Sequence, residues 1–457
     1  FYIPDRYTEG YGISEKGIEY AASIDCQLII ALDCGIRALN MADLSKKKGI
    51  DLIICDHHIP GSILPKAYAV LDPKRKDCRY PFKELSGCGV GFKLLQGFCL
   101  QHTLDLGSLF NYLDLVAVSI ASDIVPMVGE NRILAYFGMQ KINSQPLKSL
   151  QALIDIAGIK APISISDVVF YIGPRINAAG RLRHAHESVD LLISEDPVQL
   201  KDFAQRLNEV NKKRQNIDQT VTEEALRTIH EELPVTAKST VLFNPKWHKG
   251  IVGIVASRCI EHYFRPTIIL TESNGVATGS ARSVEGFDIH AALGKCADLL
   301  LQYGGHAFAA GMSLALNNVD LFKERFEEVV KNTIPSDSER PKLIVDAEVP
   351  LDFIHFKNFN ILNQMTPFGP QNMHPVFVTE HVKLVGSPKI IKEKHLKIQV
   401  KQEDTEVPIE AIAFGLGGLQ APILAAESFR IAYHIDLNEF RGRKRLQLIV
   451  KDIKFYN

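Results

Sequence analysis

Three short apolar runs, each followed by an acidic residue, constrain the fold of this chain more than any other feature of its sequence. The runs and their acidic ends are Leu28–Leu32 before Asp33, Leu52–Cys55 before Asp56-His57-His58, and Leu115–Ala121 shortly before Asp123. Continuous apolar runs of this length are typical of buried strands in a parallel sheet. Ligands of such sheets bind outside the carboxyl ends of the strands. The sequence therefore predicts one crevice that collects carboxylates and imidazoles from all three runs.

The residue types in this crevice indicate a metal site. Carboxylate oxygens together with imidazole nitrogens suit manganese, zinc or iron better than calcium. Two adjacent histidines can serve different purposes, one binding a metal and the other facing an oxyanion, while Asp56 fixes a tautomer as a supporting residue. Taken singly, Asp33 can be an ordinary strand-end residue and Asp123 a helix N-cap. Their convergence favours the metal site.

Length and composition are those of an ordinary globular protein with room for about three domains. The chain has 457 residues, of which 46% are hydrophobic and 23% charged, and its net charge is −1. This balance argues against a global attraction for polyanions, so a nucleic acid would bind in local grooves. The eight cysteines form no Cys-x-x-Cys pair, which favours reduced thiols. Since no apolar run reaches the ~18 residues of a membrane span, we expect a cytoplasmic protein without membrane contact.

The first two predicted parts of the chain are an α/β domain and a connecting helix. Residues 1–195 alternate apolar strands with helices, such as Glu15–Ile24 and Met41–Lys48, as in a doubly wound parallel-sheet domain. Residues 196–233 contain Val198–Glu232, a polar stretch without Gly or Pro. Such a stretch predicts one long, exposed helix.

The last two predicted parts are a second α/β domain, residues 234–338, and a small β-barrel, residues 339–457, separated by a Pro- and Ser-rich linker at 335–341. The second domain is predicted from strands and helices at Ser239–Phe243, Thr267–Thr271, Gly275–Ala281, Ile251–His262 and Ile289–Tyr303. Short alternating segments follow at Val382–Val385, Leu396–Val400, Glu410–Phe414, Phe429–Leu437 and Leu446–Val450. Five strands at this spacing predict an OB-type barrel, a fold whose face often binds single-stranded nucleic acid.

Three clusters of glycine with arginine or histidine add candidate phosphate contacts. Gly304–Gly311 lets the backbone approach a ligand, with His306 facing a phosphate from a helix N-terminus. Gly279–Ser283 and Gly173–Arg181 place arginines beside small residues, as phosphate clamps do. Each cluster alone can be an ordinary surface segment, but three in one chain favour a phosphorylated ligand.

Together these motifs resemble a known family. Asp56-His57-His58, with Asp33 before it and Asp123 after it, resembles the DHH phosphoesterase superfamily, and Gly304–Gly311 resembles its companion DHHA1 domain. Further stretches resemble the RecJ family within it, over essentially the whole chain. They are Tyr2–Arg6, Glu9–Gly12, Gly173–Arg181, Trp247–Gly250, Gly253–Arg258 and Pro367–Pro370.

The resemblance implies a 5′-to-3′ exonuclease that degrades single-stranded DNA to mononucleotides in DNA repair and recombination, using two divalent cations, Mn²⁺ or Mg²⁺. It implies that Asp33 bridges the cations and that His57 and Asp123 bind one of them. Asp56 would support the site and His58 would contact the scissile phosphate. The implied contacts along the DNA strand are Arg6, Tyr11, Arg175, Asn177, Arg181, Gln215, Arg258, Ser280, Arg282 and His306.

The family's first motif, an Asp-x-Asp pair that supplies further metal ligands, has no counterpart near Phe1. We expect it upstream of Phe1, and we expect reduced activity without it. The resemblance also implies a monomer that receives its DNA from a helicase and a single-strand-binding protein. Two alternatives stay open: a DHH phosphodiesterase for short oligonucleotides or cyclic dinucleotides, which normally lacks the long helix and the barrel, and a catalytically silent member that only binds single-stranded DNA.

Overall fold

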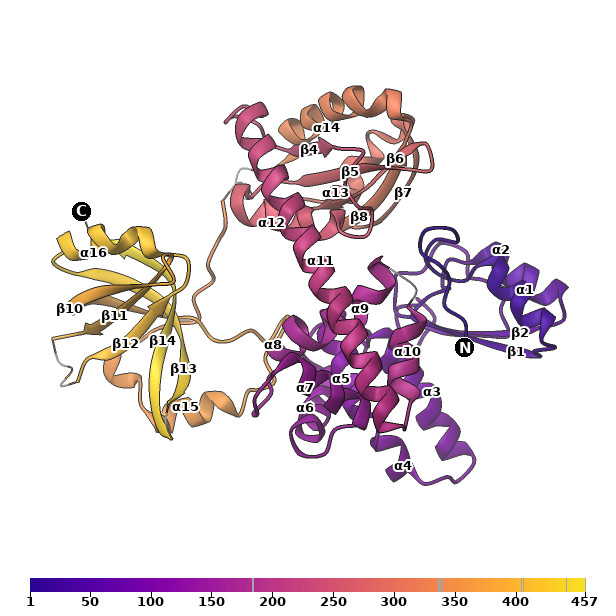
Figure 1. The fold of residues 1–457 in the computed structure, drawn as a ribbon, viewed down its shortest axis with the longest axis horizontal. Helices are drawn as coiled ribbons and strands as arrows, with labels where there is room; N and C mark the ends of the chain where they lie inside the picture. The colour runs from indigo at the N-terminus through magenta and orange to yellow at the C-terminus, as the bar shows by residue number, and fades with distance from the viewer. Residues whose placement is uncertain are drawn as a thin grey trace.

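The computed structural model describes residues 1–182, 185–335, 338, 340–403, 405, 407–440 and 442–456, so part of the predicted linker at 335–341 lies outside the described residues. In Figure 1 the long helix α11 runs from the helices of the N-terminal region to the second α/β domain, and the β-barrel lies to one side of both. Among the described residues, no helix is long and apolar enough to cross a membrane.

A three-stranded parallel sheet begins the N-terminal region, in the order β1-β2-β3. Its strands and flanking helices are β1 (Leu28–Leu32), β2 (Asp51–Cys55), β3 (Ala69–Leu71), α1 (Glu15–Ser23) and α2 (Leu39–Lys47). Ser14 caps α1 by accepting a hydrogen bond from the Gly17 amide. The parallel pairing of the first two apolar runs and the two early helices confirm the prediction.

The third apolar run does not form the predicted strand but belongs to helix α5 (Leu113–Ser122). A short, uniformly apolar run fits a buried helix as well as a buried strand, since it lacks a periodic polar face. Here α5 packs between α3 (Gly87–Gln101) and α6 (Gly129–Ser144), and its middle residues are buried on all sides. The alternation of strands and helices, predicted to continue to about residue 195, therefore ends at β3.

Helices make up the rest of this region. After α3, α5 and α6, they are α4 (Leu106–Phe110), α7 (Lys148–Ala157), α8 (Ile165–Asp167), a π-helical turn (Val168–Ile172), α9 (Gly173–Leu182) and α10 (His186–Ile193). Helix α11 (Pro197–Glu232) follows as the single long helix that was predicted, but it is not exposed on all sides, because one face is buried against α7, α9, α10 and α12 (Val252–Tyr263). Asp196 caps it by accepting from the Val198 and Gln199 amides, and Pro197 occupies its first turn, where a missing amide proton costs nothing.

The second domain contains a five-stranded sheet in the order β4-β5-β6-β8-β7. Its elements are β4 (Thr240–Phe243), α12 (Val252–Tyr263), β5 (Thr267–Ser273), β6 (Val276–Arg282), α13 (Ile289–Gly294), β7 (Leu300–His306), β8 (Ala309–Leu314) and α14 (Val319–Thr333). The helix predicted to reach Tyr303 ends at Gly294, and Gly304–Gly311 forms a β-hairpin instead of a loop at a helix N-terminus. Gly305 has a φ of +143°, and a Cβ there would lie 2.3 Å from the Ala309 carbonyl oxygen. Glycine thus allows the close hairpin pairing.

The C-terminal sheet closes into a five-stranded barrel, as predicted, because β10 pairs with both β11 and β13. Its elements are β9 (Ala347–Glu348), α15 (Phe356–Asn363), β10 (Phe377–Ile391), β11 (His395–Lys401), β12 (Ile409–Ala413), α16 (Gln420–Ala425), β13 (Phe429–Phe440) and β14 (Arg443–Phe455). Phe429 and Tyr433 are fully buried in its core. The alternation of inward apolar and outward polar residues accounts for the success of this prediction.

Candidate metal centre and phosphate site

The three predicted metal ligands lie together at the carboxyl ends of β1, β2 and α5. His57 Nε2 lies 3.1 Å from Asp33 Oδ1 and 3.2 Å from Asp123 Oδ2. Asp33 follows β1 directly, and Asp123 is the C-cap residue of α5. The predicted convergence is therefore present, although the third side chain comes from a helix.

His57 is oriented with one ring nitrogen available to a cation. Its Nδ1 lies 3.0 Å from the Leu85 carbonyl oxygen and donates to it, which leaves the Nε2 lone pair free in the neutral imidazole. Nε2 is buried and has no hydrogen-bond partner among the described residues. A buried nitrogen of this kind costs free energy unless a proton or a metal ion occupies the position. One imidazole nitrogen between two carboxylates fits Mn²⁺.

The neighbouring carboxylates change the protonation of His57. Burial lowers the pKa of His57, but the Asp33 carboxylate 3.1 Å from Nε2 and the charge of Asp123 outweigh burial and raise this pKa above its usual value. Burial raises the pKa of Asp123, an effect that the nearby imidazole of His57 partly offsets. When Nε2 carries a proton, the imidazolium lies between the two carboxylates and screens them from each other.

We expect the affinity for Mn²⁺ to increase with pH until the pH passes the raised pKa of His57. The cation must displace the proton from Nε2, so binding weakens about tenfold for each pH unit below that pKa. Because this pKa lies above the usual value of about 6.5, the dependence extends toward neutral pH. Calorimetric titration with Mn²⁺ between about pH 6 and about pH 8 measures it, and a constant affinity over that interval would contradict the assignment.

Asp56 fixes the loop that carries both histidines. Its Oδ2 accepts from the Ile36 amide at 2.9 Å, and its Oδ1 accepts from the His57 amide at 2.8 Å and from His58 Nδ1 at 2.7 Å. Burial alone would raise the pKa of Asp56, but these hydrogen bonds, led by that from His58, lower it to about 2. Since Nδ1 of His58 is held by Asp56, the other ring nitrogen points away from it.

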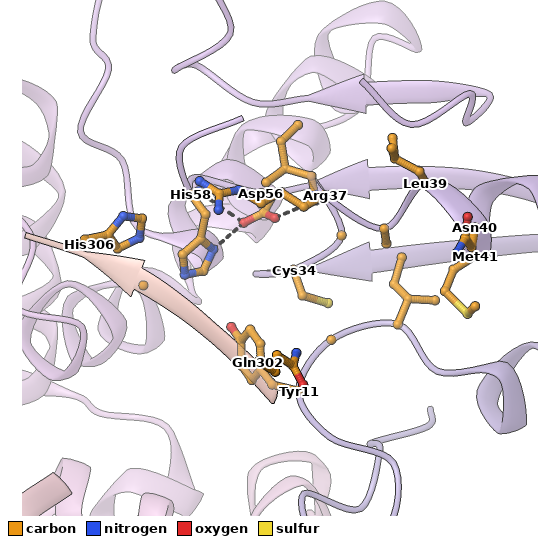
Figure 2. A pocket seen from close by; sticks show the side chains of 16 residues that line it. Tyr11, Cys34, Arg37, Leu39, Asn40, Met41, Asp56, His58, Gln302 and His306 are labelled. Atoms are coloured by element: carbon orange, nitrogen blue, oxygen red, sulfur yellow. Dashed lines mark hydrogen bonds and ion pairs between the residues drawn. The ribbon is translucent and has the colours of Figure 1, made fainter. Parts of the chain in front are cut away.

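A cavity of about 650 Å³ lies beside His58, between the first and second domains (Figure 2). His58 stacks against His306 of β7 across this boundary, with ring centroids 6.4 Å apart and an interplanar angle of 11°. Arg37 and Gln302 also line the cavity, and sequence reasoning missed both. In the sequence, only its position four residues after Asp33 indicated that Arg37 could lie near the site.

Asp72 is a further acidic residue that sequence reasoning missed. It directly follows β3, is 3% exposed, and its Oδ2 has no hydrogen-bond partner within the described ranges. Burial, together with the charge of Asp56, raises its pKa to about 6. The signal was the same as for Asp33, an acidic residue directly after an apolar run.

Tyr11, which the resemblance assigns to the 5′ end of the strand, lies beside Asp33 and His58. Its hydroxyl donates to the Asp33 carbonyl at 2.8 Å, and its ring meets the ring of His58 edge-on at 6.2 Å. Arg6 is exposed in the same N-terminal loop, and Glu9 braces this loop by accepting from the Asp5 amide at 3.0 Å. This loop therefore contributes Tyr11 to the lining of the cavity, whereas Arg6 is not one of the lining residues.

Arginines gather where α9, β6 and α12 meet. Arg282 Nη1 donates to Ser280 Oγ at 2.6 Å, and a Cβ on Gly253, in the first turn of α12, would lie 2.8 Å from Arg282 Nη2. Burial lowers the pKa of Arg181, as do the positive charges of Arg6 and Arg282 and of Arg214 on α11. Mutually repelling guanidinium groups beside a helix N-terminus are suited to an anion such as phosphate.

Other predicted DNA contacts have protein partners or lie apart from this cluster. Arg175 donates from Nε to Asn208 Oδ1 at 3.1 Å and from Nη1 to the Tyr171 carbonyl at 2.7 Å, which ties it to its own helical region. Arg258 Nη2 lies 2.8 Å from Oδ2 of Asp218, a fully buried residue of α11. Asn177 on α9 and Gln215 on α11 are exposed.

The fold and the site together place this chain in the DHH class of proteins. The matching family models are "DHH family, N-terminal domain" over residues 1–120, "DHHA1 domain" over 235–332 and "RecJ OB domain" over 345–452. The chain belongs to the RecJ family.

Curated and structural relatives carry the same name. The single-stranded-DNA-specific exonuclease RecJ of Bacillus subtilis is 36% identical, over 99% of this chain and 57% of that relative. RecJ of Escherichia coli is 32% identical, over 99% of this chain and 82% of that relative. The crystal structure of Thermus thermophilus RecJ in complex with Mn²⁺ matches with a TM-score of 0.85 and 26% identity, over 97% of this chain and 64% of that chain. The chain thus spans little more than half of the Bacillus relative.

Proposed function

We propose that this chain is the catalytic core of a single-stranded-DNA-specific 5′-to-3′ exonuclease that uses two divalent cations, Mn²⁺ or Mg²⁺. The observation that carries the proposal is the position of His57 Nε2 between the carboxylates of Asp33 and Asp123. Relatives at 32% and 36% identity are named single-stranded-DNA-specific exonucleases. Structures of the Thermus relative in complex with Mn²⁺ and with Mg²⁺ support the choice of cations.

Asp33, His57 and Asp123 would hold the cations. Bound divalent cations supply a hydroxide-like water at neutral pH and stabilise the charge that develops on a phosphate. Asp56 accepts from His58 Nδ1, so the opposite ring nitrogen faces the cavity, where it would donate to a phosphate oxygen when the ring is an imidazolium. The hydrogen bond from His57 to Leu85 keeps the tautomer that binds metal through Nε2.

The DNA strand would pass between the first two domains. Arg181, Ser280, Arg282 and His306 would bind its phosphates, while Arg6 and Tyr11 would hold the 5′ end, by charge and by stacking. A passage between two domains that admits one strand would exclude a duplex without reading bases. The barrel would hold the incoming strand, and the roles of Arg175, Asn177, Gln215 and Arg258 stay predictions.

The outer face of β1 supports the expectation of further residues at the metal centre. In the part of the chain that the structure describes, β1 pairs with β2 alone. Leu28, Ile30 and Leu32 are 46%, 47% and 55% exposed on this edge strand. Exposed edge strands with apolar side chains are normally covered. We therefore propose that a further polypeptide segment covers β1 in the functional protein.

The deciding experiment is degradation of 5′-phosphorylated single strands by the protein with its upstream residues restored. We expect release of mononucleotides from the 5′ end in Mn²⁺, resistance of the matching duplex, and little activity with ethylenediaminetetraacetate. A dinucleotide cleaved faster than a long strand would favour the small-substrate phosphodiesterase instead. Binding of single strands without any hydrolysis would favour the silent member.

Several finer expectations remain proposals alongside this function. The division into parts at residues 195, 233 and 338 is one of them. The monomeric state, the cytoplasmic location, the delivery of DNA by a helicase and a single-strand-binding protein, and the role in repair and recombination are the others.

A further inference from the structure

Arg132 of α6 binds the end of a helix that belongs to the barrel. Its Nη2 donates to the carbonyls of Gln364 at 3.0 Å and Thr366 at 3.3 Å, and its Nε donates to the carbonyl of Met365 at 3.2 Å. Gln364 is the C-cap residue of α15, where a helix has unpaired, partly negative carbonyl groups, and Met365 and Thr366 follow it. One guanidinium thus satisfies three acceptors. We call residues 364–372, between α15 and β10, the docking segment.

The docking segment also rests on the chain that leads from Asp123 into α6. The Met127 amide donates to the Pro370 carbonyl at 2.7 Å, and a Cβ on Gly369 would lie 3.1 Å from Met127 Cβ. Asn372 Nδ2 donates to the carbonyls of Met365 and Pro367, both at 3.0 Å, which braces the segment internally. Met127 is 1% exposed. The segment therefore fits against a fixed surface.

Hydrogen bonds contribute much of the attachment between the docking segment and the α6 region, because the apolar packing between them is incomplete. A cavity of about 490 Å³ lies beside Arg132 and is lined by Met127, Ile361 and Met365 among others. On the other side, Phe359 and Leu362 of α15 pack against the barrel core. Helix α15 thus packs on the barrel by apolar contacts, and the segment that follows it binds the metal-site region by polar contacts.

We propose that Arg132 and the docking segment fix the orientation of the barrel relative to the metal centre, so that a strand bound on the barrel reaches the centre. Arg132 is a positioning residue in this arrangement and contacts no substrate. The need to deliver a strand rests on the proposed function, whereas the fixed orientation rests on the hydrogen bonds alone. Loss of the contact lowers the effective concentration of the strand at the centre without altering the metal ligands.

The test is the substitution Arg132→Ala in the intact protein, measured by hydrogen exchange and by small-angle X-ray scattering. Faster exchange of the Met127 amide and a larger radius of gyration are expected, because the segment no longer covers that amide. For long single strands, KM should rise about tenfold, with kcat on a dinucleotide unchanged. Gly369→Val, which wedges the segment away from Met127 while keeping Arg132, should have the same effects.

Two further variants make the result specific. Arg132→Lys keeps the charge but has one ammonium for three carbonyls, so it should restore part of the exchange protection. Arg79→Ala removes an exposed arginine that makes no hydrogen bond or ion pair with the described residues, and it should behave as the parent. Unchanged exchange and scattering in both Arg132→Ala and Gly369→Val overturn the proposal. Altered exchange and scattering support it even in a protein without nuclease activity, a result that would refute the proposed function instead.

Discussion

Replacement of His57 by alanine is expected to abolish Mn²⁺ binding at the centre and to lower kcat/KM on single-stranded DNA by about 10²-fold or more. The substitution removes the nitrogen that lies 3.1 Å from Asp33 and 3.2 Å from Asp123. It also leaves the two carboxylates facing each other without an intervening ligand or proton, which raises the free energy of the site. Calorimetric titration with Mn²⁺ and the single-strand degradation assay measure the two effects.

The matched control is His230→Ala, at an exposed position near the end of α11. It removes the same ring far from the metal centre, so affinity for Mn²⁺ and turnover should equal those of the parent. If His57→Ala retained both properties as well, the centre would lie elsewhere in the protein. The assignment of Asp33 and Asp123 would then fail with it.

The sequence predicted the positions of side chains best where the geometry of a single strand determines them. Asp33 and Asp56 were located correctly because the carboxyl ends of parallel strands share one edge of a sheet. The barrel strands were found because a half-buried strand alternates its residues. Asp123 was placed at the site for a reason that was partly wrong, since its preceding run is helical. A short apolar run records burial but not the type of element.

Features that depend on contacts between distant residues could not be predicted. Arg258 was expected on the DNA, but its partner Asp218 lies 40 positions earlier on a buried face of α11. Sequence pattern gives no signal for such a pair. The same holds for the contact of Arg132 with residues 364–366, which crosses between two folding units. Only the tertiary arrangement decides whether an arginine binds protein or ligand.

Gly87→Ala is expected to weaken Mn²⁺ binding by about 10-fold to 100-fold and to lower turnover by a similar factor, although it introduces a better helix former. Gly87 is the first residue of α3, and a Cβ there would lie 2.1 Å from Asp33 Oδ1 and 2.5 Å from Asp33 Cβ. The backbone of Asp33 cannot easily retreat, because its amide donates to the Cys55 carbonyl and its carbonyl accepts from Tyr11, both at 2.8 Å. The carboxylate must therefore turn away from His57.

A second glycine of the same helix separates this effect from helix propensity. Gly97 lies in the interior of α3, and a Cβ there would have no atom within 4 Å. Gly97→Ala should therefore stabilise the protein by about 0.5–1 kcal/mol and leave Mn²⁺ affinity unchanged. Calorimetric titration with Mn²⁺ and thermal unfolding of both variants distinguish the effect on the metal site from the effect on helix stability. Parent-like Mn²⁺ affinity in Gly87→Ala would mean that α3 does not confine Asp33. A loss in Gly87→Ala alone would show that the close approach of a helix N-terminus to a strand-end carboxylate holds this ligand in place.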